Sequence, residues 1–276
     1  MITTMFWSCT GVDASELSFG TAELLSEKER TLIAELPCLG IPRLGFACGV
    51  MDRGRNMEAA ITHFEQHNRI SWDMVHPVGK RLFALPASVF ATPDYPVAAK
   101  VGVDTMMDFV PALQHLAQSR DCSRLVLECQ GQLSSPMTFF SLKAADQVVI
   151  PLGKTTDTAY VLTSIRRLVQ IYMHPPGKFI LAAVGNLRAI ESVVSVKNID
   201  NAMLDGLRVV AWDARKIRAA LLSGGLPGEA RPDASEAWPE ASETETRAET
   251  AAAAAGGMGA AAEMACMMRT AMDDTA

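Results

Sequence analysis

Seven short apolar segments recur along the first 226 residues of this 276-residue chain. Each is continuously apolar rather than alternating, which is typical of strands that are buried on both faces of a parallel sheet. Segments with apolar residues at helical spacing lie between them. The predicted strands are 2–7, 31–36, 81–86, 124–129, 146–152, 178–184 and 207–212, and the predicted helices are 15–28, 57–66, 104–119, 135–144, 155–174 and 215–222. The predicted fold class is α/β: a doubly wound, mostly parallel sheet of about seven strands with helices on both faces.

The composition changes sharply near residue 227. The first 226 residues hold 22 Lys and Arg against 21 Asp and Glu, whereas residues 227–276 hold ten acids and three arginines. We therefore expect one α/β domain over 1–226, followed by an acidic, Ala-rich and disordered tail over 227–276. Methionines at helix-like spacing make 260–272 the part of the tail that fits a partner or membrane helix, although its single positive charge disfavours membrane contact.

Charge and cysteine usage exclude several classes of protein. A near-neutral body with an acidic tail offers no electrostatic surface for nucleic acid, so we expect no nucleic-acid binding. The six cysteines form no Cys-x-x-Cys pair, which favours reduced structural thiols. The chain has neither a signal-peptide pattern nor an apolar run of roughly 20 residues, and we expect a cytoplasmic protein.

The loop after the first predicted strand has the strand, loop, helix context of a phosphate-binding loop. The seven positions of this loop are Cys9, Thr10, Gly11, Val12, Asp13, Ala14 and Ser15. The loop resembles, in its place, that of the MinD/ParA class of ATPases, which reads Lys-Gly-Gly-x-Gly-Lys-Thr/Ser. Only Gly11 and Ser15 match, and both lysines are absent.

Further segments resemble the same class in the same order. The segment 141–152 is similar to its Ala-Leu-x-Ala-Ala-Asp-x-Val-Ile-Ile-Pro sequence, and 124–133 resembles its Asp-Thr-Pro-Pro-Gly-Leu switch, with Glu128 in place of the metal-linked Asp. Glu35 and Pro37 stand where the class has Asp-x-Asp. The resemblance covers 1–226, and within the class it is most marked to the TadZ/CpaE proteins of tight-adherence pilus assembly. Those proteins tolerate atypical phosphate loops and act as localising hubs.

The resemblance implies a remnant nucleotide and metal site formed by Gly11, Ser15, Glu35 and Glu128. A lysine contact to phosphate is worth about 1.5–3 kcal/mol, and a combined loss of about 4–6 kcal/mol lowers affinity by roughly 10³–10⁴. Asp13 adds a carboxylate that repels phosphate, and Pro37 has no side chain that could orient water. We expect an inactive site with no catalytic residue, no bound cofactor and no metal, in which the two glutamates make structural hydrogen bonds.

The implied function is a non-catalytic scaffold or localisation factor for pilus or secretion machinery, which acts as a homodimer and through machinery proteins. Two alternatives stay open. The first is a weak ATP- and Mg-dependent switch, in which loop amides and Ser15 suffice for binding and a partner supplies positive charge. The second is a polysaccharide-export regulator related to bacterial tyrosine kinases, although the chain lacks a tyrosine-rich tail.

Two weaker patterns have ordinary explanations beside functional ones. His63 and His67 are four residues apart on a predicted helix, a spacing that permits metal binding, but no third ligand is evident and an exposed helix face explains the pair. Arg166 and Arg167 could bind an acidic partner, whereas a solvated helix face is the common reason for such a pair.

Overall fold

A computed structural model describes residues 1–37, 41–90, 102–153, 155–199 and 204–223. Its single sheet has the order β3-β4-β2-β5-β1-β6-β7-β8. All neighbouring strands pair in parallel except β3, which runs antiparallel to β4. The strands are β1 (Ile2–Ser8), β2 (Thr31–Glu35), β3 (His76–Pro77), β4 (Leu82–Leu85), β5 (Arg124–Gln130), β6 (Gln147–Leu152), β7 (Phe179–Ala183) and β8 (Arg208–Ala211). The predicted fold class is confirmed, while the predicted tail over 227–276 lies outside the described residues.

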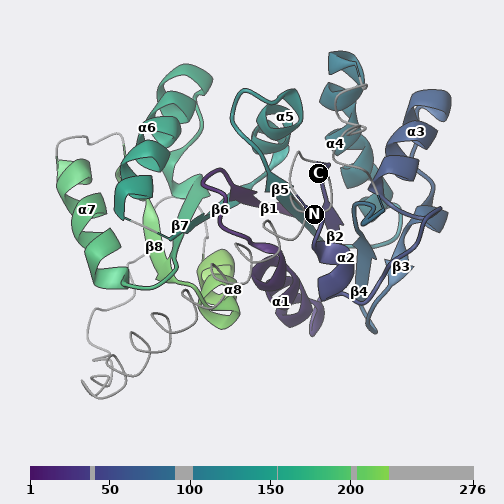
Figure 1. Cartoon of the computed structure of the whole chain (residues 1–276), viewed down its shortest axis with the longest axis horizontal. Coiled ribbons are helices and arrows are strands. Elements are labelled where there is room, and N and C mark those ends of the chain that lie inside the picture. Colours follow the sequence, from purple (N-terminus) through teal and green to yellow (C-terminus); the bar gives the residue numbers. More distant parts are fainter. Residues whose placement is uncertain (38–40, 91–101, 154, 200–203, 224–276) are drawn as a thin grey trace, which may run out of the picture. The chain divides into compact units, whose positions relative to one another are not determined.

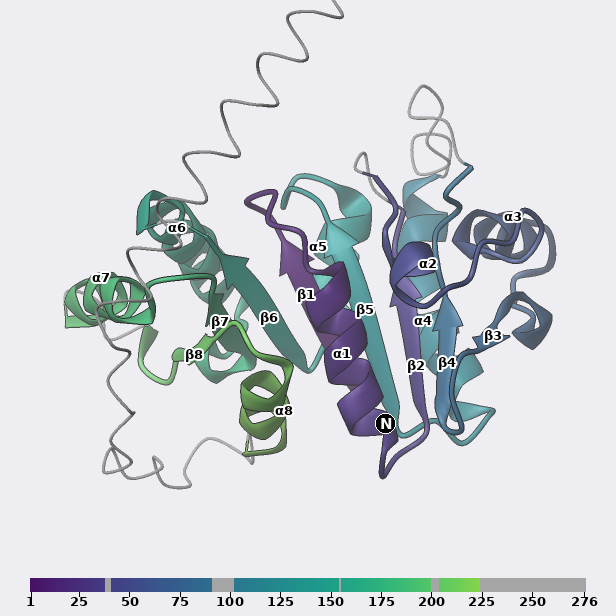
Figure 2. The ribbon, with the colours of Figure 1, turned by 60° about the horizontal axis from the view of Figure 1, so that its bottom comes forward.

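Helices cover both faces of the sheet (Figures 1 and 2). The first group comprises α3 (Met57–His67), α4 (Val103–Gln118), α5 (Pro136–Ala144), α6 (Thr155–Tyr172) and α7 (Leu187–Ile199). The opposite face carries α1 (Ser15–Ser26), α2 (Leu44–Ala47) and α8 (Ala214–Ser223). Because helices shield the sheet on both sides, every residue of β2, β6 and β7 is buried, as the continuous apolar segments predict.

Three elements have no counterpart among the predicted ones. β3 and α2 are two and four residues long, too short to show a hydrophobic period. α7 is rich in β-branched residues, which lowers its intrinsic helix propensity. Its start nevertheless has a recognisable signal, because the Asn186 side chain accepts a hydrogen bond from Ala189 N at 3.0 Å.

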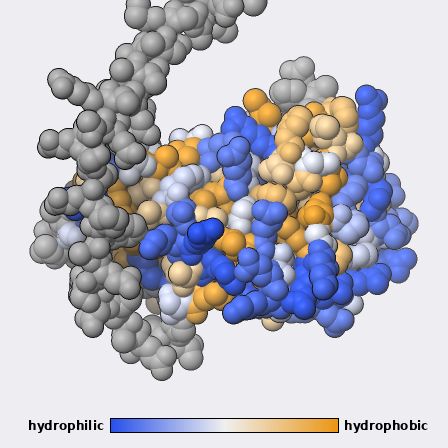
Figure 3. All heavy atoms as spheres, turned by 90° about the horizontal axis from the view of Figure 1, so that it is seen from below, coloured by the Kyte–Doolittle hydropathy of each residue, from blue (hydrophilic) through white to orange (hydrophobic). Residues whose placement is uncertain are grey.

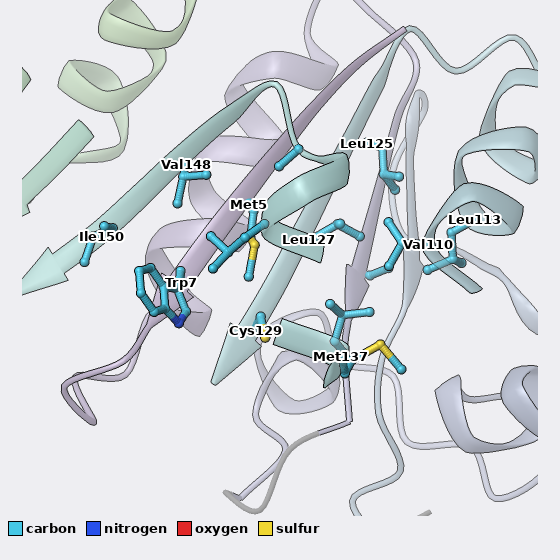
Figure 4. Close-up of a cluster of buried hydrophobic side chains, with 14 of the residues drawn as sticks. Met5, Trp7, Val110, Leu113, Leu125, Leu127, Cys129, Met137, Val148 and Ile150 are labelled. Atoms are coloured by element: carbon cyan, nitrogen blue, oxygen red, sulfur yellow. The ribbon is translucent and has the colours of Figure 1, made fainter. Parts of the chain in front are cut away.

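Two hydrophobic cores lie on opposite sides of the sheet. Successive residues of β1 alternate between them: Met5 and Trp7 belong to the core under α3–α7, whereas Phe6 belongs to the core under α1, α2 and α8. Figure 4 shows part of the larger core, where side chains of β1, β5 and β6 meet residues of α4 and α5. Because alternate residues of a strand must enter the two cores, the cores fix the register in which the central strands pair. The carboxyl ends of these strands therefore lie side by side.

Two of the remaining expectations concern thiols and membranes. The cysteines within the described residues, at positions 9, 48, 122 and 129, form no disulfide; Cys122 and Cys129 are buried, and Cys9 and Cys48 are partly buried. Across the described residues, none of the helices combines the length and the apolar character that crossing a bilayer demands.

Candidate functional site

Residues of the site that the resemblance implies come together at the carboxyl edge of the sheet. β5 lies between β1 and β2, and all three strands run in parallel. Glu35 on β2 is paired in register with Glu128 on β5, and the loop after β1 leads into α1, whose first residue is Ser15. Three of the four predicted site residues therefore lie together, although part of the loop after β2, residues 38–40, lies outside the described chain.

Glu128 is completely buried and tied to the first turn of α1. Its Oε1 accepts a hydrogen bond from Ser15 Oγ at 2.5 Å, and its Oε2 accepts one from Ser18 Oγ at 3.0 Å. Burial raises the pKa of Glu128, with a smaller contribution from the charge of Asp13, against the effect of the serine hydrogen bonds. The Glu128 side chain therefore links β5 to the first turn of α1.

Glu35 accepts hydrogen bonds from backbone amides in the segments that follow β2 and β4. Its Oε1 accepts from Arg43 N at 2.8 Å and from Leu44 N at 3.4 Å, and its Oε2 accepts from Ala87 N at 3.0 Å. Burial first, and then the charge of Glu128, raise the pKa of Glu35 to about 8 despite these three donors. The raised pKa favours the protonated form of the Glu35 carboxyl, which is a poor metal ligand.

Asp13 lies at the amino end of α1, where the backbone amides of a helix attract negative charge. Its Oδ1 accepts from Ser15 N at 3.0 Å and lies 2.9 Å from Ser15 Oγ, whose one hydrogen is donated to Glu128, and its Oδ2 forms an ion pair with Arg43. Burial acts to raise the pKa of Asp13, but the hydrogen bonds from Ser15 and Arg43 and the charge of Arg43 outweigh it, and the pKa is lowered. The amino end of α1, which attracts negative charge, is thus occupied by the chain's own carboxylate.

The sequence offers no signal for Arg43 as this partner, because it lies 30 residues beyond Asp13 in a segment with no predicted element. Sequence reasoning treated Asp13 only as a charge that repels phosphate. The structure adds a stabilising role, because the carboxylate links the loop after β1 to the start of α2.

Gly11, the fourth predicted site residue, has a backbone reason for being glycine. Its φ is +79°, and a Cβ atom at this position would meet no atom within 4 Å. Within the chain, Gly11 is needed for its left-handed conformation and not for a close approach to another group. The loop is also held at Ser8, whose hydroxyl donates to Val12 O, and at Thr10, whose hydroxyl donates to Pro151 O at 3.4 Å.

A pocket of about 400 Å³ opens beside this loop on the face that carries α1, α2 and α8. Figure 3 shows that face, where apolar surface is interspersed with hydrophilic side chains. The pocket is lined by Asp13, Ser15, Glu16, Ile41, Arg43, Phe46 and Ala47. Its lining carries two carboxylates and one guanidinium, so it is not a cationic site for a triphosphate.

These residues do not fit a magnesium nucleotide. The loop has no lysine, a carboxylate takes the anion position, and Glu35 and Glu128 are committed to protein donors. Within the described ranges, no group of three or more His, Cys, Asp or Glu side chains could hold a metal ion. His63 and His67 belong to no such group: their rings lie 4.5 Å apart, and His63 Nδ1 contacts Arg69 O at 2.8 Å.

No protein-family model matches the sequence, and no curated protein matches it. Solved structures do resemble it. A plasmid partition protein from Borrelia burgdorferi superposes with a TM-score of 0.61 at 13% identity, over 81% of this chain and 99% of that one. A ParA family ATPase from Chlorobium tepidum gives 0.56 at 14%, over 81% and 90%. The MinC:MinD cell division protein complex of Aquifex aeolicus gives 0.55 at 11%, over 80% and 85%. At such identities the likeness establishes the fold: this chain has the fold of ParA/MinD-type P-loop ATPases.

Proposed function

We propose that this protein is a non-catalytic scaffold or localisation factor built on the ParA/MinD-type fold, and that it serves the assembly of a pilus or secretion machinery. The pilus assignment rests on the sequence resemblance to TadZ/CpaE proteins. Action through a protein surface has a parallel among the similar structures, since one of them is a complex of MinC with MinD. The proposed place of action is the cytoplasm, with recruitment to a pole or to inner-membrane machinery.

The observation that carries the proposal is the self-occupied anion position at the amino end of α1. In a working phosphate loop, backbone amides and lysines face the phosphates. Here the Asp13 carboxylate accepts from the Ser15 amide, and Arg43 neutralises that carboxylate through an ion pair. A phosphate would have to displace the Asp13 carboxylate, and the loop has no lysine that could bind it.

Calorimetric titration with ATP and magnesium tests the proposal. The wild-type protein should show no binding tighter than about 1 mM, which is the affinity left when a micromolar site loses about 4 kcal/mol. The double change Asp13→Gly with Ala14→Lys, which restores the glycine and lysine of the loop, should bring back part of the affinity. A dissociation constant in the low micromolar range for the wild type would rule out a non-catalytic scaffold of this kind.

Arg43 favours one alternative, the weak ATP-dependent switch, because it brings into the pocket a positive charge that the loop lacks. In that case Asp13→Asn, which removes the competing charge at nearly constant volume, should give measurable nucleotide binding. Adding Arg43→Ala to it should abolish that binding. If Asp13→Asn binds no nucleotide, the switch alternative fails and the scaffold proposal stands.

We also propose that the protein forms a homodimer through the carboxyl edge of the sheet. The loops at 9–15, 35–40 and 128–133 would lie at the contact. Because the Asp13 carboxylate is neutralised by Arg43 within each chain, two copies can approach without the phosphate repulsion that a nucleotide-loaded edge would bring.

A further inference from the structure

An exposed aromatic and aliphatic surface lies where the last turn of α6 meets α5. It consists of Phe139, Ile171, Tyr172 and Met173, and we call it the aromatic ledge. Met173 is 81% exposed, Ile171 64% and Tyr172 47%. The Tyr172 and Phe139 rings contact each other edge to face at 4.8 Å between centroids, so the ledge is continuous across the two helices. Figure 1 shows α5 and α6 on the same face of the sheet.

The ledge lies away from the candidate site. α6 ends where the chain returns to the amino end of β7, whereas the loop after β1 and the pocket beside it lie at the carboxyl edge. A partner that binds the ledge would leave the carboxyl edge free. Both surfaces can therefore act in the same molecule.

Two exposed cations border the ledge. Lys143 lies one helical turn after Phe139 on α5, whereas Lys178 is buried and donates to Leu142 O, and the exposed acid Asp146 follows α5 by two residues. Lys143 and Arg167 are exposed, and Arg167 lies one helical turn before Ile171, on the same side of α6. An apolar surface with a cationic border is complementary to a partner that combines apolar and acidic side chains.

We propose that the aromatic ledge binds an acidic, amphipathic helix of a protein partner. This inference rests on the proposed scaffold function, for which it supplies a docking surface and a partner class. Tyr, Phe, Met and Arg are the residue types enriched at the centre of protein interfaces. The edge-to-face contact with Phe139 holds Tyr172 before binding, which reduces the ordering that a partner must impose.

An anionic membrane is the other surface with suitable chemistry, and the small number of cations favours the helix. Segments that bind anionic lipid carry clusters of roughly four to eight Lys or Arg residues, whereas Lys143 and Arg167 are the exposed cations of α5 and of residues 158–178. A ledge between two helices suits the apolar side of a third helix.

The test uses two synthetic helical peptides of about 18 residues, long enough to hold helical structure. Both carry the same leucine face, and their opposite faces carry either glutamate or lysine. Fluorescence anisotropy with the full-length protein should show that the acidic peptide binds and that the basic one does not. Met173→Glu should weaken binding of the acidic peptide about tenfold or more, because it adds a like charge within the apolar contact. Arg167→Glu should weaken it as well.

Matched controls separate this result from misfolding. Tyr172→Phe keeps the ring and should bind like the wild type, whereas Tyr172→Ala should not. Phe46→Glu alters an equally exposed aromatic residue, 59% exposed, on the opposite face and should leave binding unchanged. Each variant should melt within a few degrees of the wild type, as expected for surface changes.

Three outcomes would overturn the assignment. The first is equal binding of the two peptides, or acidic-peptide binding that Met173→Glu leaves intact. The second is cosedimentation with phosphatidylserine vesicles that Met173→Glu abolishes, which would make the ledge a membrane contact. The third is a dimer that Met173→Glu dissociates, which would make it a self-contact. The ATP titration reports separately on the scaffold proposal, so the failure of one is distinguishable from the failure of the other.

Discussion

The two buried glutamates, Glu35 and Glu128, combine a structural role with a cost in free energy. Each carboxyl group accepts hydrogen bonds from the protein. The two residues are also buried and paired in register on adjacent strands, and burial raises the pKa of both. A carboxyl group whose pKa is raised on folding holds a proton that the unfolded chain releases. Its contribution to stability is complete below the unfolded pKa and is lost as pH rises through the folded pKa.

For Glu35 this window runs from its ordinary pKa of 4.5 up to about 8. The lowered pKa values of His174, about 4, and Lys178, about 8, add slopes of the opposite sign, so the Glu35 contribution is the difference between the wild type and Glu35→Gln. Measured with urea from about pH 5 to about 8.5, the free energy of unfolding of the wild type should fall relative to that of Glu35→Gln by roughly 2–4 kcal/mol, whatever constant offset the amide introduces. Glu23→Gln, at an exposed position of α1, is the control and should keep the wild-type slope. Parallel slopes for wild type and Glu35→Gln would contradict the raised pKa.

A contact between two residues could be predicted from the sequence where their positions along adjacent strands determine that they pair. Glu35 ends β2 and Glu128 lies near the end of the adjacent parallel strand β5, so their convergence follows from the strand pattern. The Asp13–Arg43 ion pair could not be predicted in the same way, because Arg43 comes from an irregular segment whose path depends on tertiary packing. The same limit applied to Gly11, where a sequence cannot distinguish a positive φ from a close approach.

At the scale of elements, the connection between β5 and α5 is packed tightly around Gly131. The carbonyl oxygen of Gly131 accepts a hydrogen bond from Trp7 Nε1 at 2.8 Å, and a Cβ atom at Gly131 would collide with Thr138 Oγ1. Thr138 is buried in the first turns of α5, and its β-branched side chain has little freedom to move. Gly131 therefore sets how closely the loop lies against α5.

We expect Gly131→Ala to lower the free energy of unfolding by about 1–3 kcal/mol through overpacking. Thr138→Ala removes the colliding oxygen, so the double variant should be more stable than the sum of the two single changes predicts. Gly102→Ala is a suitable control, because a Cβ atom there would meet no atom within 4 Å. Urea unfolding of the four variants measures this coupling, and strictly additive effects would show that Thr138 is not the obstacle.

Helices and strands could be predicted from the sequence where they are long enough to show a hydrophobic pattern. The seven predicted strands all occur, since a parallel strand covered on both faces is continuously apolar. The eighth strand, β3, is a two-residue antiparallel pairing at the sheet edge, where neither burial nor period marks the chain. α7 was missed because its β-branched residues resemble neither a strand with an apolar run nor a typical helix.

At the scale of the α/β unit, the sheet presents two edges with different chemistry. The carboxyl edge holds the closed loop after β1, and the amino side carries the aromatic ledge with its cationic border. In a nucleotide-driven protein of this fold, the carboxyl edge would bind and release phosphates. Here the Asp13 carboxylate at that edge is neutralised by Arg43. A contact between two copies at this edge therefore need not depend on a nucleotide.

A homodimer at the carboxyl edge should respond to charge at Gly11. Gly11→Arg places a cation in open space on the loop after β1, and the two-fold symmetry brings a second copy of that cation to the same contact. Burying like charges together costs several kcal/mol, so the variant should shift towards monomer in analytical ultracentrifugation at concentrations on the order of tens of micromolar. Gly11→Ala carries the same backbone strain at φ +79° without the charge and should remain dimeric, as should Arg167→Glu on α6. A monomeric wild type, or a dimer that survives Gly11→Arg, would mean that the protein associates through another surface.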